Sequence, residues 1–450
     1  MKRGIRAIFS VLLLLLTSCS SNGSSLINDG QRLAAAGQAG KQLHAYDSPY
    51  TLCYQNLDAT YSLYVFAAPI QYDTGKGYTF IDNTLISSQR LPFAFENKAN
   101  RIKCYFPPVL SEDCLIESEE DTLRFRPLFD VSSFSRGQQV EMANQYGDTV
   151  HGILYQSPST DILLYATKAG IRWEFILKQE PAEHFFQFRV QSSAPELENR
   201  RNGYISFQKD AVKSALVYAP LISCGKKITT DSELSYCKDG DAVEITLMLP
   251  DELFSSGSDA YPIRLDPSFE LYQNKMPDTS VYSEFNTNSF LRQYAIVGQH
   301  PQLGEGWEYL RLRINHFFSL KKDSILQATY HTKSLYETPE TDLSLRLDSV
   351  NQDWSSTNMV WDDRILPKAQ TVCPVINRLY TFDITDFVNE AVNDVDGFKE
   401  SNGLVMRAED NGEGYAILAT SDNSVYTPYI EIRLSREPYA FIPRENINEI

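Results

Sequence analysis

The segment Ile171-Arg-Trp-Glu-Phe-Ile-Leu177 alternates apolar and polar side chains and is rich in aromatic and β-branched residues. This two-residue period is typical of a β-strand, because successive side chains of a strand point to opposite faces of its sheet. The neighbouring segments Asp161-Ile-Leu-Leu-Tyr165 and Phe185-Phe-Gln-Phe-Arg-Val190 have a similar composition, and short runs containing Gly170 or Pro181 separate the three. Consecutive strands joined by short turns are therefore predicted in this part of the chain.

The same pattern continues in both directions, for example in Tyr61-Ser-Leu-Tyr-Val-Phe66 and Val243-Glu-Ile-Thr-Leu-Met-Leu249. Helical periodicity is scarce. Its clearest instance is Ile384–Val392, which Asp383 or Thr385 could cap. Many short strands at regular spacing favour β-sandwiches over a parallel sheet. We therefore predict an all-β chain with two β-sandwich (jelly-roll-like) regions in tandem.

The boundary between the two regions is predicted near Pro262 and Pro267, which bracket a short strand. This places an N-terminal β-rich region at residues 45–268, a C-terminal β-sandwich at residues 269–434 and a tail at residues 435–450. A chain of 450 residues is too long for one hydrophobic core and suits two or three domains. Its hydrophobic content of 42%, with 12% aromatic residues, is sufficient for packed cores.

The N-terminus has the composition of an export signal, with three basic residues in the first six, the apolar run Val11–Leu16 and small residues before Cys19. The apolar run is shorter than the roughly 20 residues that span a bilayer. Leu16-Thr-Ser-Cys19 resembles the bacterial lipobox, which implies removal of residues 1–18 and a lipid, diacylglycerol with palmitate-type chains, on Cys19. An ordinary signal peptide cut nearby is the alternative. Because several acyl chains bind membranes durably, we expect an exported lipoprotein anchored to the cell membrane or the outer membrane.

Residues 19–44 are rich in Ser, Gly, Ala and Gln and are predicted to form a flexible tether. Without residues 1–18 the chain has 38 basic and 58 acidic residues, a formal net charge of −20. This charge repels phosphate backbones and anionic headgroups. Nucleic acid is therefore not an expected partner, and membrane attachment depends on the lipid. A neutral or small cationic ligand remains open.

Six cysteines remain besides Cys19. Cys104 and Cys114, and likewise Cys224 and Cys237, are close enough in sequence to close hairpin-like loops. Disulfides persist outside the cytoplasm, so these two pairs are candidate disulfides, although six cysteines allow fifteen pairings and free buried thiols are the alternative. No Cys-x-x-Cys occurs and the histidines are scattered singly, so no metal site of the zinc type is expected.

Residues 269–434 contain short segments in an order shared with one family of bacterial surface domains. The segments are Asp278–Val281, Tyr309–Ile314, Ile325–Tyr330, Trp354–Trp361, Phe382–Thr385, Asn402–Val405, Ala419–Ser421 and Pro428–Ile430. Together they resemble the DNRLRE-type β-sandwich domain, which is related to alginate-binding carbohydrate-binding modules, although the six-residue motif of that name is absent. The resemblance implies a β-sandwich that binds carbohydrate or another envelope component.

The N-terminal region is similar to the β-rich region that precedes such domains in wall-associated and Rhs-like proteins. Tyr78-Thr-Phe-Ile-Asp-Asn-Thr-Leu85 and Tyr261-Pro-Ile-Arg-Leu-Asp-Pro267 are the segments that resemble it. The resemblance implies an extracytoplasmic β-scaffold without catalytic residues.

Strand alternation places four candidate ligand-binding residues on one face: Trp307, Tyr309, Arg311 and Arg313. An aromatic ring can stack on a sugar, and a guanidinium can pair with a uronate carboxylate. The alternative is that the same row faces inward and belongs to the core. We expect no cofactor. The acidic segments Asp410-Asn-Gly-Glu-Gly414 and Asp362-Asp363 are the candidates for a structural calcium site. The alternative for Asn411-Gly412, which the sequence favours, is the turn of a β-hairpin.

The sequence contains no Gly-x-Ser-x-Gly, His-Glu-x-x-His or glycine-rich phosphate loop. We therefore expect a non-enzymatic surface lipoprotein with no catalytic residues, which binds a polysaccharide or another envelope component through its C-terminal β-sandwich. A structural or adhesive spacer is the alternative. A glycan-active hydrolase or lyase is a third interpretation, because paired carboxylates cannot be recognised without their separation.

Overall fold

The computed structural model describes residues 39–441, apart from residues 195, 201–202, 211, 225–226, 230–231, 256–260, 274, 286–288, 290–291, 313–317, 339–342, 366–370, 374–378, 394–401, 410–413 and 439. Within these ranges the chain consists mainly of antiparallel β-strands with one short α-helix, which confirms the prediction of a β-rich fold. Residues 1–38, with the predicted signal peptide, Cys19 and most of the tether, lie outside the described residues. No helix of the described part is long and apolar enough to cross a membrane.

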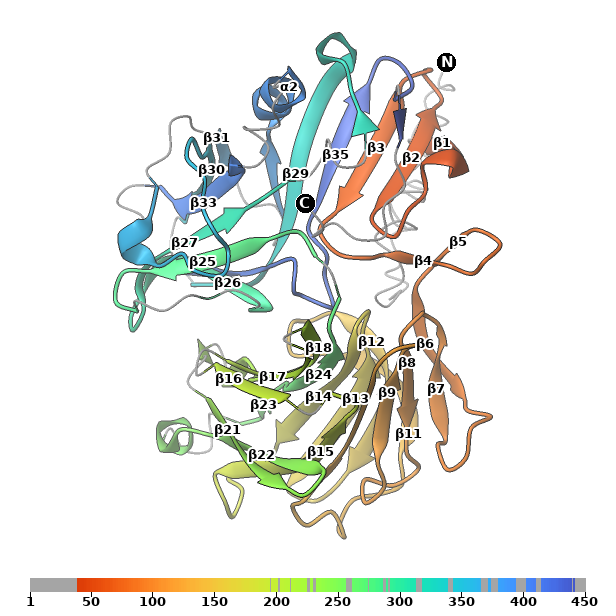
Figure 1. The fold of residues 1–450 in the computed structure, drawn as a ribbon. Helices are drawn as coiled ribbons and strands as arrows, with labels where there is room; N and C mark the ends of the chain where they lie inside the picture. Colours follow the sequence, from red (N-terminus) through yellow and green to blue (C-terminus); the bar gives the residue numbers. More distant parts are fainter. Residues whose placement is uncertain are drawn as a thin grey trace, which may run out of the picture.

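The upper lobe of Figure 1 is built on a sheet of thirteen strands among the described residues. These strands are β1 (Ala39–Gln42), β2 (Thr51–Asn56), β3 (Tyr61–Phe66), β25 (Asp278–Tyr282), β26 (Tyr294–His300), β27 (Gly304–Leu310), β29 (Ile325–Glu337), β30 (Leu345–Ser349), β31 (Thr371–Cys373), β32 (Leu379–Asp383), β33 (Leu404–Ala408), β34 (Tyr415–Ala419) and β35 (Tyr429–Leu434). Strand β29 joins two arms of this sheet, because its first part pairs with β35 and β32 and its last residues pair with β34. Side chains from both arms form one core, which includes Leu63, Phe382 and Ile432.

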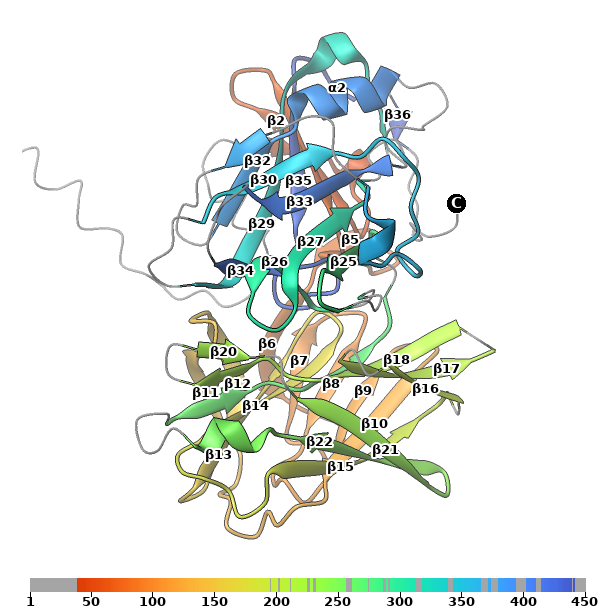
Figure 2. The same ribbon diagram turned by 90° about the vertical axis from the view of Figure 1, so that its left-hand side faces the viewer.

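The lower lobe of Figure 1 contains two sheets, with eight and eleven strands among the described residues. The first is formed by β6 (Asp82–Ser87), β7 (Phe95–Ala99), β8 (Lys103–Phe106), β9 (Cys114–Glu117), β10 (Thr122–Pro127), β15 (Phe185–Ser192), β21 (Glu233–Asp239) and β22 (Ala242–Met248). The second is formed by β11 (Gln138–Ala143), β12 (Thr149–Gln156), β13 (Thr160–Ala166), β14 (Gly170–Leu177), β16 (Glu196–Arg200), β17 (Tyr204–Lys209), β18 (Val212–Tyr218), β19 (Ile222–Cys224), β20 (Lys227–Thr229), β23 (Ile263–Leu265) and β24 (Ser268–Leu271). Figure 2 shows the same two lobes from the side.

One large core lies between these two sheets. Phe125 of β10 stacks on Phe269 of β24 with ring centroids 3.9 Å apart, and Trp173 of β14 meets Phe188 of β15 edge to face at 5.3 Å. The apolar residues of the alternating segments therefore face one another across the two sheets, as the period-2 pattern requires. Trp173 is fully buried in this core.

The N-terminal strands belong to the upper lobe, which differs from a division of the chain at residue 268. Strand β3 pairs with β35 along its whole length, from Tyr61 opposite Leu434 to Phe66 opposite Tyr429. This pairing buries Leu63 and Val65 in the upper core. An alternating pattern specifies a strand and its inward face but not its partner, so the pattern of residues 51–66 does not reveal that these strands pair within the upper lobe.

Residues at the two predicted ends also take part in sheets. Ala39–Gln42 of the predicted tether form β1, which pairs with β2, and Ala440–Phe441 of the predicted tail form β36, which pairs with β28 (Phe318–Ser319). A further small hairpin is formed by β4 (Gln71–Asp73) and β5 (Tyr78–Phe80). The short 3-10 turns are η1 (His44–Tyr46), η2 (Asp251–Phe254), η4 (Lys322–Ser324) and η5 (Trp361–Asp363).

The predicted short helix is confirmed as α2 (Thr385–Asn393). The carboxylate of Asp383 accepts hydrogen bonds from the backbone N–H of Thr385 at 2.9 Å and from its hydroxyl at 2.6 Å. The helix therefore begins at a capping residue, as the sequence indicated. Val388 and Ala391 are buried and anchor its inner face to the upper lobe.

Candidate ligand-binding site

Two of the four candidate ligand-binding residues are buried. Trp307 and Tyr309 lie in β27 with exposed fractions of 4% and 0%. Trp307 meets the ring of Trp361 at 5.5 Å, and Tyr309 meets that of Trp354 at 5.6 Å. The two side chains thus share one face of the strand, but a packed cluster covers that face, in line with the core alternative of the sequence analysis.

The segment 350–365 closes this cluster. The hydroxyl of Tyr309 donates to the carbonyl of Ile365 at 3.2 Å and accepts from its N–H at 3.1 Å. Arg311, which follows β27, donates to Asp353 at 2.7 Å, and its guanidinium lies 4.8 Å from the centre of the Trp354 ring. Arg311 is thus engaged within the protein, and Arg313 lies outside the described residues.

The predicted disulfides are not formed. Cys104 and Cys114 are free buried thiols. Cys104 of β8 lies opposite Ile116 of β9, so Cys114 is displaced by two residues and is not directly across the strand pair. Cys224 lies in β19 and Cys237 in β21, strands of different sheets, and no bond joins them. Two cysteines that are close in sequence can still be offset along a strand pair or lie in different sheets, and the sequence does not reveal either arrangement.

The candidate calcium ligands are only partly described. Residues 410–413 lie outside the described part of the chain, and Asp362 and Asp363 are exposed in η5. Across the described ranges no three histidine, cysteine, aspartate or glutamate side chains come together in a group that could hold a metal ion.

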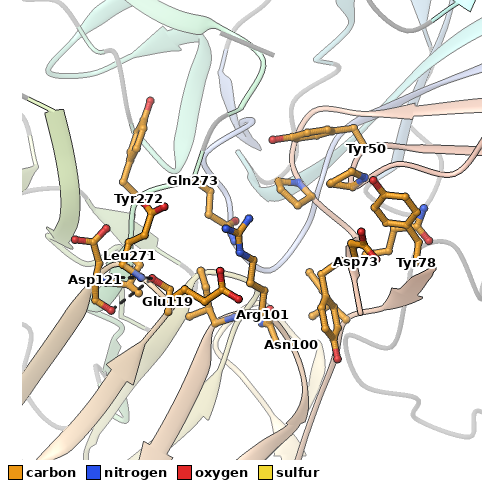
Figure 3. Close-up of a pocket in the computed structure, with 18 of the residues that line it drawn as sticks. Tyr50, Asp73, Tyr78, Asn100, Arg101, Glu119, Asp121, Leu271, Tyr272 and Gln273 are labelled. Carbon is orange, nitrogen blue, oxygen red and sulfur yellow. Dashed lines mark hydrogen bonds between the residues drawn. The ribbon is translucent and has the colours of Figure 1, made fainter. Parts of the chain in front are cut away.

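A pocket with a volume of about 450 Å³ lies between the lobes. Four separate parts of the chain line it: residues 49–81 of the upper lobe and its hairpin, the β7–β8 turn, the β9–β10 turn, and residues 271–273 at the end of β24. Figure 3 shows Arg101 and Gln273 reaching into the space between Glu119 on one side and Tyr50, Asp73 and Tyr78 on the other.

Four tyrosines are among the residues that line the pocket. Tyr50, Tyr72 and Tyr78 come from the upper lobe and its hairpin, and Tyr272 comes from the segment after β24. Gln71 holds the hairpin in place, because its side-chain amide donates to the carbonyls of Ser48 at 2.6 Å and Thr51 at 3.1 Å. The wall that carries Tyr72 is therefore anchored to the upper lobe.

Burial raises the pKa of Tyr272 to about 12, with a smaller contribution from the charge of Asp422. Burial also raises the pKa of Tyr72. Both phenols thus remain protonated at neutral pH and can donate a hydrogen bond to a ligand, but they do not serve as bases.

Polar side chains lie on the two turns of the lower lobe. Arg101 is exposed at the β7–β8 turn and forms no ion pair within the described part of the chain. The adjacent Asn100 is buried and fixed by its hydrogen bond to the carbonyl of Lys168 at 3.2 Å. Glu119 and Glu120 are exposed on the β9–β10 turn, beside Asp121, whose carboxylate accepts from the hydroxyls of Ser214 and Ser193. The pocket thus offers aromatic faces, carboxylates and one unpaired guanidinium.

The sequence patterns predicted no ligand-binding residue in this pocket. Tyr78 begins a segment that resembles a scaffold region, and Arg101, Glu119 and Tyr272 have no motif around them. These residues are distant in sequence and meet only because strands of both lobes meet, so no local pattern could have indicated them.

Buried charged groups also link the two lobes. Arg172 of β14 lies 3.0 Å from Asp266 and donates to the side chain of Gln293, just before β26. Gln293 in turn donates to Glu270 of β24 at 2.6 Å. The hydroxyl of Tyr146 donates to Asp266 at 2.7 Å. This network crosses the lobe contact without exposure to solvent.

We expect the free energy of unfolding to fall as the pH rises from about 4 to about 8. Burial raises the pKa of Asp266 to about 6 and that of Glu174 to about 8, although Arg172 and Arg264 lower them. The folded protein therefore holds protons that an unfolded chain, with carboxyl pKa values near 4, releases in this range. Urea unfolding at pH 5, 6.5 and 8 measures the slope. Glu174→Gln should flatten it above pH 6, and a stability that rises towards pH 8 would contradict the expectation.

No protein-family model matches the chain, and no curated protein is similar enough to count as a match. The geometry of the pocket and the sequence patterns are therefore the basis for assigning a function.

Proposed function

We propose that this chain is an exported, lipid-anchored protein that binds carbohydrate, and that the pocket between the lobes is its binding site. The lipobox-like Leu16-Thr-Ser-Cys19 supports the anchor. The resemblance of residues 269–434 to DNRLRE-type domains supports a glycan as ligand. We further propose that each lobe is a jelly-roll-like β-sandwich, since core residues of the lower lobe come from two sheets and those of the upper lobe from two arms of one sheet.

The observation that carries the binding proposal is the composition of the pocket. Four tyrosines line a space of about 450 Å³ together with Arg101, Gln273 and several carboxylates. Aromatic rings pack against the C–H faces of a pyranose, and amide, carboxylate and guanidinium groups hydrogen-bond its hydroxyls. A pocket of this size with a few convergent polar groups suits a small ligand or one or two sugar units of a longer chain.

Binding fits the pocket better than hydrolysis does. Glycosidases need one carboxyl that is shielded from water so that it stays protonated as the general acid. Asp73 and Glu119, which lie on opposite walls in Figure 3, are both exposed.

Replacing Tyr272 or Tyr78 with alanine is expected to weaken glycan binding at least tenfold, because each loses an aromatic face in the pocket while only half-buried. Affinity electrophoresis through gels containing hydroxyethyl cellulose, glycol chitosan or alginate measures retention. Tyr236→Ala is the matched control, since Tyr236 is 36% exposed on the edge strand β21, outside the pocket. Equal retention of all three variants, or no retention of the parent by any polymer, would overturn the proposal.

Cys19→Ser is expected to move the protein from the membrane fraction to the soluble fraction of the producing cells. The remaining chain is strongly acidic and repelled by anionic headgroups, so it has no electrostatic attachment to replace the lipid. Cys237→Ser, which changes an exposed cysteine far from the N-terminus in sequence, should leave fractionation unchanged. A Cys19→Ser protein that stays with the membranes, together with a parent protein whose mass shows no lipid, would contradict the anchor.

A further inference from the structure

We propose that the glycan recognised by the pocket carries amino groups, as in a polymer of deacetylated hexosamine, and is not a uronate polymer. This inference rests on the proposed function and specifies its ligand. It follows from the charges of the pocket, which the sequence could not place together.

The pocket is acidic. Its lining includes Asp73, Glu119, Glu120 and Asp121 against the single base Arg101, a formal charge of −3. A uronate entering this space would meet four carboxylates, whereas an ammonium group would be attracted by them.

None of these four carboxylates has a cationic partner among the described residues. Asp73 accepts from the N–H of Gly75 at 2.8 Å, and Asp121 accepts from serine hydroxyls, so both are held by neutral donors. Glu119 and Glu120 extend from an exposed turn. Their charges are therefore available to a ligand, in contrast to the carboxylates at the lobe contact, such as Asp266, which pairs with Arg172.

Two further observations favour an amine on a sugar over other cations. Three of the carboxylates are consecutive on the β9–β10 turn and the fourth, that of Asp73, comes from the β4–β5 hairpin, and the four do not form a metal-binding group among the described residues. Tyr272 and Tyr78 line the space from different lobes, and aromatic residues suit the C–H faces of a pyranose better than a thin aliphatic chain such as a polyamine. Arg101 can donate to the hydroxyl and ring oxygens of the same sugar.

Isothermal titration of the purified chain without residues 1–18 with three tetrasaccharides tests this inference. These are glucosamine, N-acetylglucosamine and galacturonate oligomers at pH 6. We expect the glucosamine oligomer to bind at least tenfold more tightly than the acetylated one, with an affinity that falls as salt rises. The galacturonate oligomer should bind most weakly. Tighter binding of galacturonate, or equal binding of the two hexosamine oligomers, would overturn the inference.

Variants separate this inference from the proposed function. Glu119→Gln/Glu120→Gln should reduce the preference for glucosamine to less than threefold while N-acetylglucosamine binding persists. The matched control Glu233→Gln/Glu244→Gln changes the net charge equally on β21 and β22, outside the pocket, and should retain the preference. Loss of preference in both double variants would indicate general charge attraction and overturn the inference. If Tyr272→Ala leaves all binding unchanged, the proposed function itself fails.

Displacement of the sugar by spermine at equal concentration would also overturn the assignment to an amino sugar.

Discussion

Replacing Arg172 with methionine is expected to lower the free energy of unfolding by about 3–5 kcal/mol. Arg172 is 1% exposed, and its guanidinium lies between Asp266 and Gln293 at the contact of the lobes. Its loss leaves a buried carboxyl that only the hydroxyl of Tyr146 and neutral groups can hydrogen-bond. The cost is large because the remaining carboxyl is shielded from water and cannot be solvated instead.

Urea unfolding at pH 7 measures this effect, and Arg189→Met is the matched control. Arg189 pairs with Asp239 at the surface, where the side chains are 33% and 52% exposed, so its removal should cost less than about 1 kcal/mol. Loss of less than 1 kcal/mol in Arg172→Met would show that the network across the lobe contact contributes little to stability. Binding measurements on both variants indicate whether the pocket depends on this contact.

Replacing Trp307 with alanine is expected to destabilise the upper lobe by about 3–5 kcal/mol without loss of glycan binding. The indole is buried against Trp361, lies 5.5 Å from the guanidinium of Arg407, and donates to Glu305 at 2.8 Å. The variant leaves a cavity under the segment 350–365, whereas no pocket-lining residue is changed.

Thermal unfolding and polysaccharide retention, measured on the same preparation, show whether Trp307 is a core residue or a ligand-binding residue. Trp361→Ala serves for comparison, since Trp361 is only half-buried and its truncation should cost less. A Trp307→Ala protein of unchanged stability that no longer binds glycan would show that the aromatic row is the binding site, and would contradict the assignment to the pocket.

The candidate site illustrates the limits of local patterns. Strand alternation correctly placed Trp307 and Tyr309 on one face, but it could not indicate that the segment 350–365 covers that face. The pocket residue Arg101 lies in the β7–β8 turn and Tyr272 directly follows β24, and neither position carries a sequence pattern that distinguishes it from other loop residues. The binding role that we propose for them depends on their position opposite residues of the other lobe.

The sequence by itself determined the β-rich class, the strand at Ile171–Leu177, and the helix after Asp383, because these depend on periodicity and capping within a few residues. Only the tertiary structure decided that β2 and β3 join the upper lobe. It also decided that Arg172 and Glu174, the polar residues of the strand Ile171–Leu177, are fully buried. A period of two residues gives each strand two faces, but what covers each face depends on contacts between residues far apart in the chain. The free energy of those contacts comes from the burial of apolar and paired charged groups, which no local segment contains.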